Sequence, residues 1–126
     1  MTRDKIAPFM VVVVCGSRSW NNRDLIRQRL SEFHTGSAVI TGNAPGADTI
    51  ACEEAARLGF EVLPVEAAPT PFAEELIDLL FELTARPEER LVLAFHENLA
   101  GSTDTARTLS IARDRGVAVE VIAGDE

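Results

Sequence analysis

Three segments of the sequence combine glycines, hydroxyl side chains and an arginine in a pattern that suits the binding of a small anion. They are residues 16–20, 42–48 and 96–105, and each follows an apolar run and precedes a stretch of helical periodicity. Small side chains let an anion approach backbone N–H groups, and a helix dipole favours negative charge at the helix N-terminus. Because ligands of open α/β sheets bind at the carboxyl ends of the strands, we expect the three segments to form one pocket.

The candidate ligand contacts come from all three segments. Arg18 is assigned to a phosphate group because its planar guanidinium offers several donors, with a surface salt bridge as an equal alternative. Trp20 either packs as the only tryptophan of a small core, which we favour, or stacks on a base. Asp48 is expected to cap the helix that follows, or else to accept hydrogen bonds from a ribose or base. The full set is Gly16, Ser17, Arg18, Trp20, Gly42, Asn43, Ala44, Gly46, Ala47, Asp48, His96, Ser102, Thr103 and Thr105.

Other polar side chains carry weaker assignments. The candidate hydroxyl donors, for which turn or capping roles are equally expected, are Ser17, Ser102, Thr103 and Thr105. His96 follows a predicted strand but lacks a paired carboxylate for acid–base catalysis. No histidine or cysteine has a partner at metal-ligand spacing, so we predict no metal and no cofactor, and we assign no catalytic residue.

The charge of the chain excludes several classes of partner. Twelve basic and twenty acidic residues give a net charge of −8, so a protein that grips a nucleic-acid backbone is not expected.

The longest apolar run, residues 7–15, is too short to span a membrane and does not resemble a signal peptide. Cys15 and Cys52 form no disulfide framework, and Cys15 is interpreted as a buried apolar residue rather than a nucleophile. We therefore expect a cytoplasmic protein.

Alternating periodicities predict the elements that position the three segments. Apolar runs rich in β-branched residues predict parallel strands at 9–14, 37–41, 61–65, 91–95 and 117–122. Amphipathic stretches predict helices at 23–32, 47–58, 71–85 and 104–115. Pro64 places the third strand at a sheet edge. The order of elements predicts an α/β fold in one domain, residues 9–122, between a loose leader at 1–8 and an acidic tail at 123–126.

The helix predicted at 71–85 is apolar over more of its circumference than one core-facing side requires. Its main stripe is widened by Ile77 and Phe81. A second burial surface is therefore expected, and we predict a homodimer through this helix, with a deeply buried helix in a monomer as the alternative.

The three segments also resemble a known family. Val13-Val-Cys-Gly-Ser-Arg-Ser-Trp20 and Val39-Ile-Thr-Gly-Asn-Ala-Pro-Gly-Ala-Asp48 are similar to the first two motifs of the SLOG superfamily, YspA-like branch. Gly101-Ser-Thr-Asp-Thr105 resembles its third, more degenerate turn. The resemblance implies a Rossmann-like three-layer sandwich, a five-stranded parallel sheet of order 3-2-1-4-5 with helices on both faces. It also implies a nucleotide or nucleotide derivative as ligand.

Two departures from the family pattern bear on catalysis. Hydrolases of the superfamily carry a catalytic glutamate after the third turn, where this chain has Ala106 or Thr108. The Arg-Asn pair that usually begins the middle helix is replaced by Pro71-Phe-Ala-Glu-Glu75. The sequence therefore favours binding of a nucleotide-like small molecule for sensing, sequestering or delivery. The alternative is an N-glycosidic phosphoribohydrolase that acts on nucleoside monophosphates.

Overall fold

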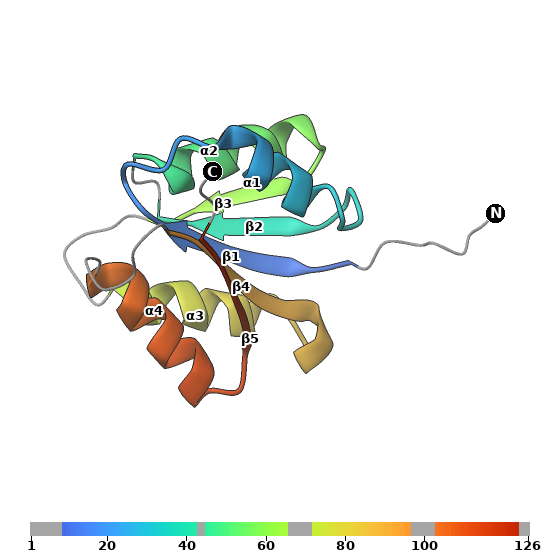
Figure 1. Ribbon diagram of the computed structural model, residues 1–126. Coiled ribbons are helices and arrows are strands. Elements are labelled where there is room, and N and C mark those ends of the chain that lie inside the picture. The colour runs from blue at the N-terminus through green and yellow to red at the C-terminus, as the bar shows by residue number, and fades with distance from the viewer. Residues whose placement is uncertain (1–8, 43–44, 66–71, 97–102, 124–126) are drawn as a thin grey trace.

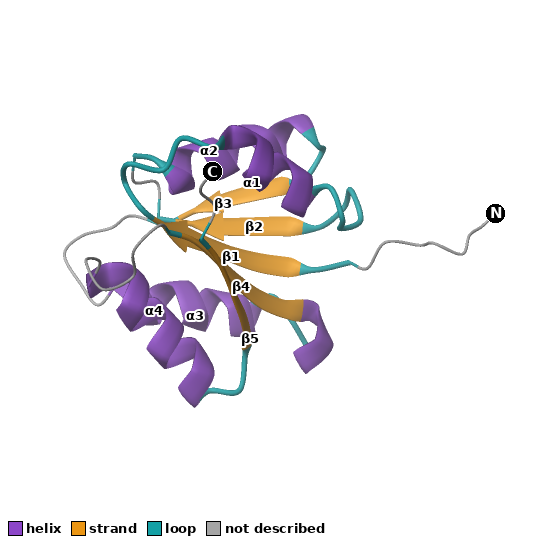
Figure 2. Ribbon diagram, in the orientation of Figure 1, coloured by secondary structure: helices purple, strands orange, loops and turns teal. Residues whose placement is uncertain are grey.

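Five parallel strands form the centre of the molecule, and helices cover both faces of the sheet (Figures 1 and 2). The computed structural model describes residues 9–42, 45–65, 72–96 and 103–123, with backbone alone at residues 72, 103 and 104. The strands are β1 (Val11–Gly16), β2 (Ala38–Thr41), β3 (Glu61–Pro64), β4 (Arg90–Phe95) and β5 (Ala118–Ile122). Their order, β3-β2-β1-β4-β5, confirms the α/β, Rossmann-like layout that the sequence predicts.

The helices divide into two pairs. They are α1 (Arg23–Leu30), α2 (Ala47–Arg57), α3 (Phe72–Glu82) and α4 (Thr103–Asp114). The first two cover one face of the sheet and the last two cover the other (Figure 1). Because all five strands are parallel, their carboxyl ends lie along one edge of the sheet, called the carboxyl edge below. Helices α1, α2 and α4 begin at this edge.

Local sequence signals explain where the helices begin and end. The side chain of Asn22 accepts a hydrogen bond from the N–H of Leu25 at 3.2 Å, so it caps α1 as predicted. Gly59 and Gly116 follow α2 and α4 with φ of +86° and +78°, a conformation that glycine adopts at low cost. Helix α3 ends at Glu82 rather than at the predicted residue 85, and a short 3-10 helix, η1 (Pro87–Glu89), follows it.

The carboxylate of Glu89 explains the early end of α3. Its Oε1 accepts hydrogen bonds from the N–H groups of Ala85 and Arg86, at 3.0 and 3.3 Å. These two hydrogen bonds lower the pKa of Glu89 from its usual range. They satisfy amides that a continuing helix would have bonded to carbonyls of its preceding turn, and the chain turns toward β4 instead.

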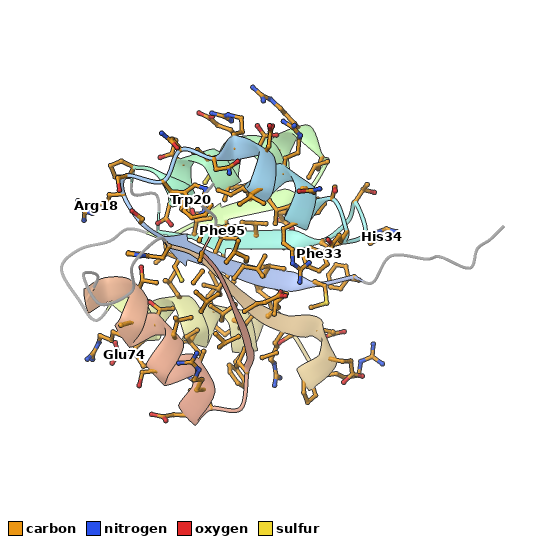
Figure 3. The ribbon with its side chains drawn as sticks, viewed as in Figure 1. Arg18, Trp20, Phe33, His34, Glu74 and Phe95 are labelled. Carbon is orange, nitrogen blue, oxygen red and sulfur yellow. The ribbon has the colours of Figure 1, made fainter. Side chains whose placement is uncertain are left out.

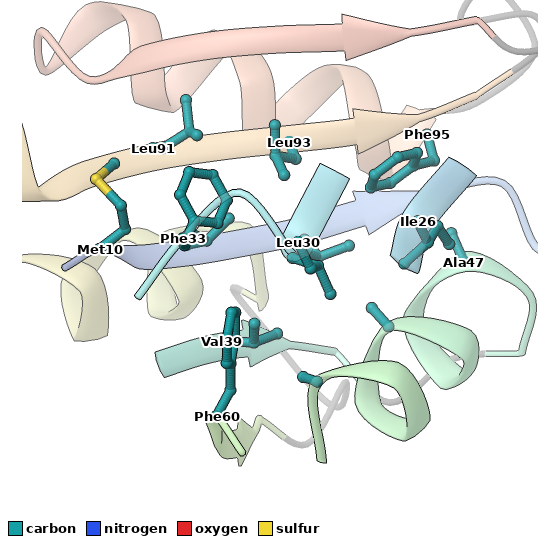
Figure 4. Packing of buried hydrophobic residues seen from close by; sticks show 14 of the residues in the cluster. Met10, Ile26, Leu30, Phe33, Val39, Ala47, Phe60, Leu91, Leu93 and Phe95 are labelled. Atoms are coloured by element: carbon teal, nitrogen blue, oxygen red, sulfur yellow. The ribbon is translucent and has the colours of Figure 1, made fainter. Parts of the chain in front are cut away.

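The sheet separates two apolar cores. Val12 and Val14 face the core under α1 and α2, whereas Val11 and Val13 face the core under α3 and α4. Burial on both sides explains why β1 is a continuous apolar run rather than an alternating one. The first core is rich in aromatic rings, and Figure 4 shows Phe33, Phe60 and Phe95 among its aliphatic side chains.

Thr41 of β2 pairs in register with Pro64 of β3, which lies at the edge of the sheet, as the proline predicts. No helix among the described residues is both long and apolar enough to cross a membrane.

Candidate ligand-binding site

The ends of three structural segments are tied together at the carboxyl edge. Ser17, directly after β1, donates its N–H to the carbonyl oxygen of Phe95 at 3.0 Å. The N–H of Ala47 in α2 donates to the carbonyl oxygen of Ser17, also at 3.0 Å. The hydroxyl of Thr105 in α4 donates to the carbonyl oxygen of Gly16 at 3.4 Å. The described parts of the three predicted segments therefore meet, as the sequence analysis expects.

Two glycines allow this close contact of backbones. A Cβ atom on Gly46 would lie 2.3 Å from the carbonyl oxygen of Ser17 and 2.5 Å from that of Arg18. Gly46 also has φ +80°, which a side chain disfavours. A Cβ atom on Gly16 would lie 2.2 Å from the carbonyl oxygen of Phe95. The glycines thus serve first to pack loop against loop, a role that turn composition alone does not distinguish from anion binding.

The loop after β1 is organised around Ser17. This residue is only 8% exposed, and its carbonyl oxygen accepts the N–H of Trp20 at 3.3 Å as well as that of Ala47. Its hydroxyl oxygen accepts the N–H of Ser19 at 3.0 Å and lies 2.8 Å from the hydroxyl oxygen of Ser19. These contacts fix the two residues that flank Arg18.

Arg18 lies exposed on the outside of this loop (Figure 3). Within the described ranges it makes no ion pair. Of the other described arginines, Arg90 and Arg113 also make none, whereas ion pairs are made by Arg23, Arg27, Arg29, Arg57, Arg86, Arg107 and Arg115. The salt-bridge interpretation of Arg18 thus finds no partner in the part of the chain that the structure describes.

Trp20 packs inside the protein. It is 3% exposed, its ring centroid lies 5.6 Å from that of Phe95, and its indole N–H donates to the carbonyl oxygen of Asn22 at 3.0 Å. Figure 3 shows it on the inner side of the loop that carries Arg18. These contacts agree with the favoured interpretation, packing, because the apolar surface of the ring is buried and its N–H has an acceptor.

The prediction that Asp48 caps α2 is wrong. The N-cap is Gly46, which offers no side-chain hydrogen bond, and Asp48 lies within the first turn. Asp48 is 7% exposed, and its carboxylate is close enough to Cys15 to affect the thiol. The sequence does not reveal the cap because the first N–H of the helix, that of Ala47, is bound by the backbone of Ser17, which is distant along the chain.

Cys15 has the properties of a buried, unreactive thiol. Burial, and secondarily the negative charge of Asp48, raises the pKa of Cys15 well above its usual range. Its sulfur lies 3.8 Å from the carbonyl oxygen of Leu93. The interpretation of Cys15 as an apolar core residue agrees with this environment.

The remaining candidates divide by what the structure describes. Gly42, His96 and Thr105 are buried near the strand ends, and Ala47 is buried in the first turn of α2. Asn43, Ala44 and Ser102 lie outside the described residues, as does the side chain of Thr103. In the described ranges, no three His, Cys, Asp or Glu side chains are grouped so as to hold a metal ion.

Sequence reasoning left out Ser19 as a candidate. No signal in the sequence distinguishes its hydroxyl, between Arg18 and Trp20, from that of Ser17. The structure separates them, because Ser19 is exposed and Ser17 is buried.

The first half of the chain is similar to a known family. Residues 10–69 match the model of the YspA, cpYpsA-related SLOG family. Over these residues the chain is similar to the SLOG superfamily. The matched segment runs from the start of β1 to just beyond β3 and contains the loops at Arg18 and Gly46. No curated protein and no solved structure matches the chain.

Proposed function

We propose that this protein binds a nucleotide or nucleotide-derived small molecule at the carboxyl edge of its sheet. The similarity of residues 10–69 to the SLOG superfamily is consistent with nucleotide-related binding or processing. The observation that carries the proposal is Arg18, which is exposed and makes no ion pair in the described ranges. Backbone hydrogen bonds from Ser17 to Phe95 and from Ala47 to Ser17 hold its loop.

The charges near this edge favour an anionic group beside Arg18. A guanidinium presents several donors to phosphate oxygens in one plane. The N-termini of α2 and α4 begin at the same edge and add the positive ends of two helix dipoles. The carboxylate of Asp48 opposes them, so we place the phosphate toward Gly42 and Gly46 rather than further along α2.

The proposed binding loops keep the residues predicted from the sequence with two adjustments. Trp20 shapes the loop from inside, because its ring is buried against Phe95. Asp48 acts from the first turn of α2 rather than as its cap. A role in sensing, sequestering or delivering the ligand follows from the lack of an assigned catalytic group.

A thermal-shift panel with a matched pair of variants tests the proposal. The ligands are nucleoside mono- and diphosphates, cyclic nucleotides, NAD and ADP-ribose, and a ligand at 100 times its Kd should add about 2.7 kcal/mol to the free energy of unfolding. Arg18→Ala should weaken binding about tenfold or more, because hydrogen bonds to charged groups contribute about 1.5–3 kcal/mol. Arg113→Ala is the control, because Arg113 is also exposed and without an ion pair among described residues but lies at the C-terminal end of α4.

The outcomes separate the candidate functions. No shift with any ligand, in protein shown to be folded, would overturn the binding proposal. Release of free base from a nucleoside monophosphate would instead establish the N-glycosidic phosphoribohydrolase. If the Arg18→Ala and Arg113→Ala variants bind the ligand with equal affinity, Arg18 does not contact the ligand.

The homodimer through residues 71–85 and the cytoplasmic location stay predictions. Light scattering during size-exclusion chromatography of the wild-type chain and of Leu83→Lys tests the dimer. Leu83 directly follows α3, and its large apolar side chain is 44% exposed. A dimeric wild-type chain that becomes monomeric in Leu83→Lys would support the prediction, and a monomeric wild-type chain would overturn it.

A further inference from the structure

Glu74 carries a carboxylate oxygen that is buried without a hydrogen-bond partner. Among the described residues, two buried side-chain oxygens accept no hydrogen bond, Oε1 of Glu54 and Oε1 of Glu74. The other oxygen of Glu54 accepts from two guanidinium groups, those of Arg23 and Arg57, which balance its charge. Within the described ranges, Glu74 has a single ion pair, from Nη2 of Arg107 to its Oε2 at 2.6 Å. Oε1 of Glu74 is therefore the buried acceptor that most needs an explanation.

The burial of this oxygen distinguishes Glu74 from the next acidic residue that joins the same two helices. Asp78 pairs with Arg115 at 2.7 Å, and its side chain is 60% exposed, so water reaches that carboxylate. The side chain of Glu74 is 36% exposed, and Oε1 lies in its buried part. A carboxylate can only accept hydrogen bonds, and a buried acceptor without a donor is costly. The dipole of α3 favours an acid in the first turn but does not supply this donor.

Glu74 lies at the carboxyl edge of the sheet. Helix α3 follows β3, and Glu74 in its first turn is tied to Arg107 of α4. The first turn of α4 reaches the end of β1 through the hydrogen bond from Thr105 to Gly16. Figure 3 shows Glu74 and Arg18 at the same end of the molecule, on the two sides of the sheet. A ligand that lies across the ends of the strands can therefore approach both side chains.

The charge of Glu74 decides which part of a nucleotide it can contact. A carboxylate repels a phosphate group, whereas hydroxyl and amino groups can donate hydrogen bonds to it. Oε2 is bound to Arg107, which holds the carboxylate in place, so Oε1 is the oxygen left for a donor of the ligand. Such a donor would supply the partner that Oε1 lacks in the free protein.

We propose that Oε1 of Glu74 accepts a hydrogen bond from an uncharged donor of the ligand, a ribose hydroxyl or a base amino group, while Arg18 binds the phosphate. This inference rests on the proposed function and deepens it, because it makes Glu74 the residue that recognises the nucleoside part of the ligand. The ligand then extends from the loop after β1 to the start of α3.

Isothermal titration with four nucleotides tests the assignment. Adenosine monophosphate is the parent compound. Its 2′-deoxy and 3′-deoxy analogues each lack one ribose hydroxyl, and inosine monophosphate lacks the base amino group. One of the three analogues should bind the wild-type chain about tenfold more weakly than the parent, and this analogue identifies the donor. Glu74→Ala should bind the parent about tenfold more weakly and should bind that analogue as well as the parent.

Two further variants separate recognition of the donor from a structural effect. Asp78→Ala removes the matched ion pair between α3 and α4 and should keep the wild-type discrimination. Glu74→Gln keeps the size of the side chain and one acceptor oxygen without the charge, so its discrimination should be intermediate. Two affinities are compared within each protein, so a general loss of affinity cancels. Thermal unfolding without ligand shows that each variant is folded.

The failure of this inference is distinguishable from failure of the proposed function. If the wild-type chain binds all four nucleotides equally, or if Glu74→Ala keeps the wild-type discrimination, the Glu74 assignment is wrong and the binding function stands. If Asp78→Ala loses the discrimination as fully as Glu74→Ala, the effect belongs to the packing of α3 on α4, and the assignment is also wrong. If the folded wild-type chain binds none of the four nucleotides, the nucleotide site itself is wrong and the Glu74 assignment falls with it.

Discussion

Two surfaces of this protein look unusual in the sequence, and the structure treats them in opposite ways. The loop after β1 exposes Arg18, a charge that no carboxylate of the described residues neutralises. The outer side of α3 carries Phe81, an aromatic ring beyond the core-facing stripe, and here two guanidinium groups cover it. The central carbon of the Arg90 guanidinium lies 4.0 Å from the ring centroid, and that of Arg115 lies 4.3 Å from it.

The arginines that cover Phe81 are held by other contacts. Arg115 pairs with Asp78 at 2.7 Å, and the Nε–H of Arg90 donates to the hydroxyl of Thr84 at 2.8 Å. Cation–π contacts thus supply within one chain part of the burial that the sequence analysis assigned to a partner. An unusual residue therefore indicates a binding surface only where the tertiary structure leaves it without a partner.

The largest expected effect breaks the contact that holds the Arg18 loop. Gly46→Ala should lower the free energy of unfolding by about 3 kcal/mol, because the new Cβ meets backbone atoms of Ser17 and Arg18 and the residue has φ +80°. Gly116→Ala is the matched control, since its φ is +78° but nothing lies within 4 Å of the new Cβ. It should cost about 1 kcal/mol. Urea unfolding measures both, and equal losses would show that loop packing at Gly46 contributes nothing beyond backbone strain.

A smaller effect tests the covered surface. Phe81→Ala should lower the free energy of unfolding by about 2 kcal/mol, because it removes a partly buried ring and two cation–π contacts of about 0.5–1 kcal/mol each. Leu83→Ala, at a 44% exposed side chain nearby, should change it by less than about 0.5 kcal/mol. Chemical denaturation compares them. If Leu83→Ala lowers the free energy of unfolding more than Phe81→Ala does, then Leu83, and not Phe81, is the covered residue on this side of the protein.

The smallest expected effect depends on pH and concerns the thiol under the Arg18 loop. Because burial raises the pKa of Cys15 in the folded state, its stabilising contribution is complete below the ordinary thiol pKa of 9.0 and is lost as the pH rises above it. The free energy of unfolding should fall by about 1 kcal/mol between pH 9 and pH 10 in the wild-type chain relative to Cys15→Ala. The chain has no tyrosine that would titrate in this range. Identical pH profiles for the two proteins would contradict the protected position of Cys15.

Local signals carry most of the fold. Three such signals are the apolar run that becomes β1, the Asn22 cap and Pro64 in the edge strand. Each acts on its own residues or on near neighbours in the chain, so its effect can be predicted from the sequence. The bounds of the helices shift where a more distant side chain intervenes, as when Glu89 binds the amides that follow α3.

The site is only partly predictable for the same reason. The sequence identifies Arg18, Gly46 and Thr105 as unusual, but it does not show which polar groups are used inside the protein. Ser17 and Ser19 are chemically alike, and only packing against Phe95 and Ala47 buries one and leaves the other exposed.

The sequence by itself determined the alternation of strands and helices, the apolar centre of the sheet and the loops that end its strands, because these depend on periodicity and on single residues. Only the tertiary structure decided which charges and rings are paired. Arg29 finds Glu120 and Arg107 finds Glu74 far along the chain, whereas Arg18 finds no such carboxylate among the described residues. Pairing requires atoms within a few ångströms, and which residues come that close is set by the packing of all the elements at once.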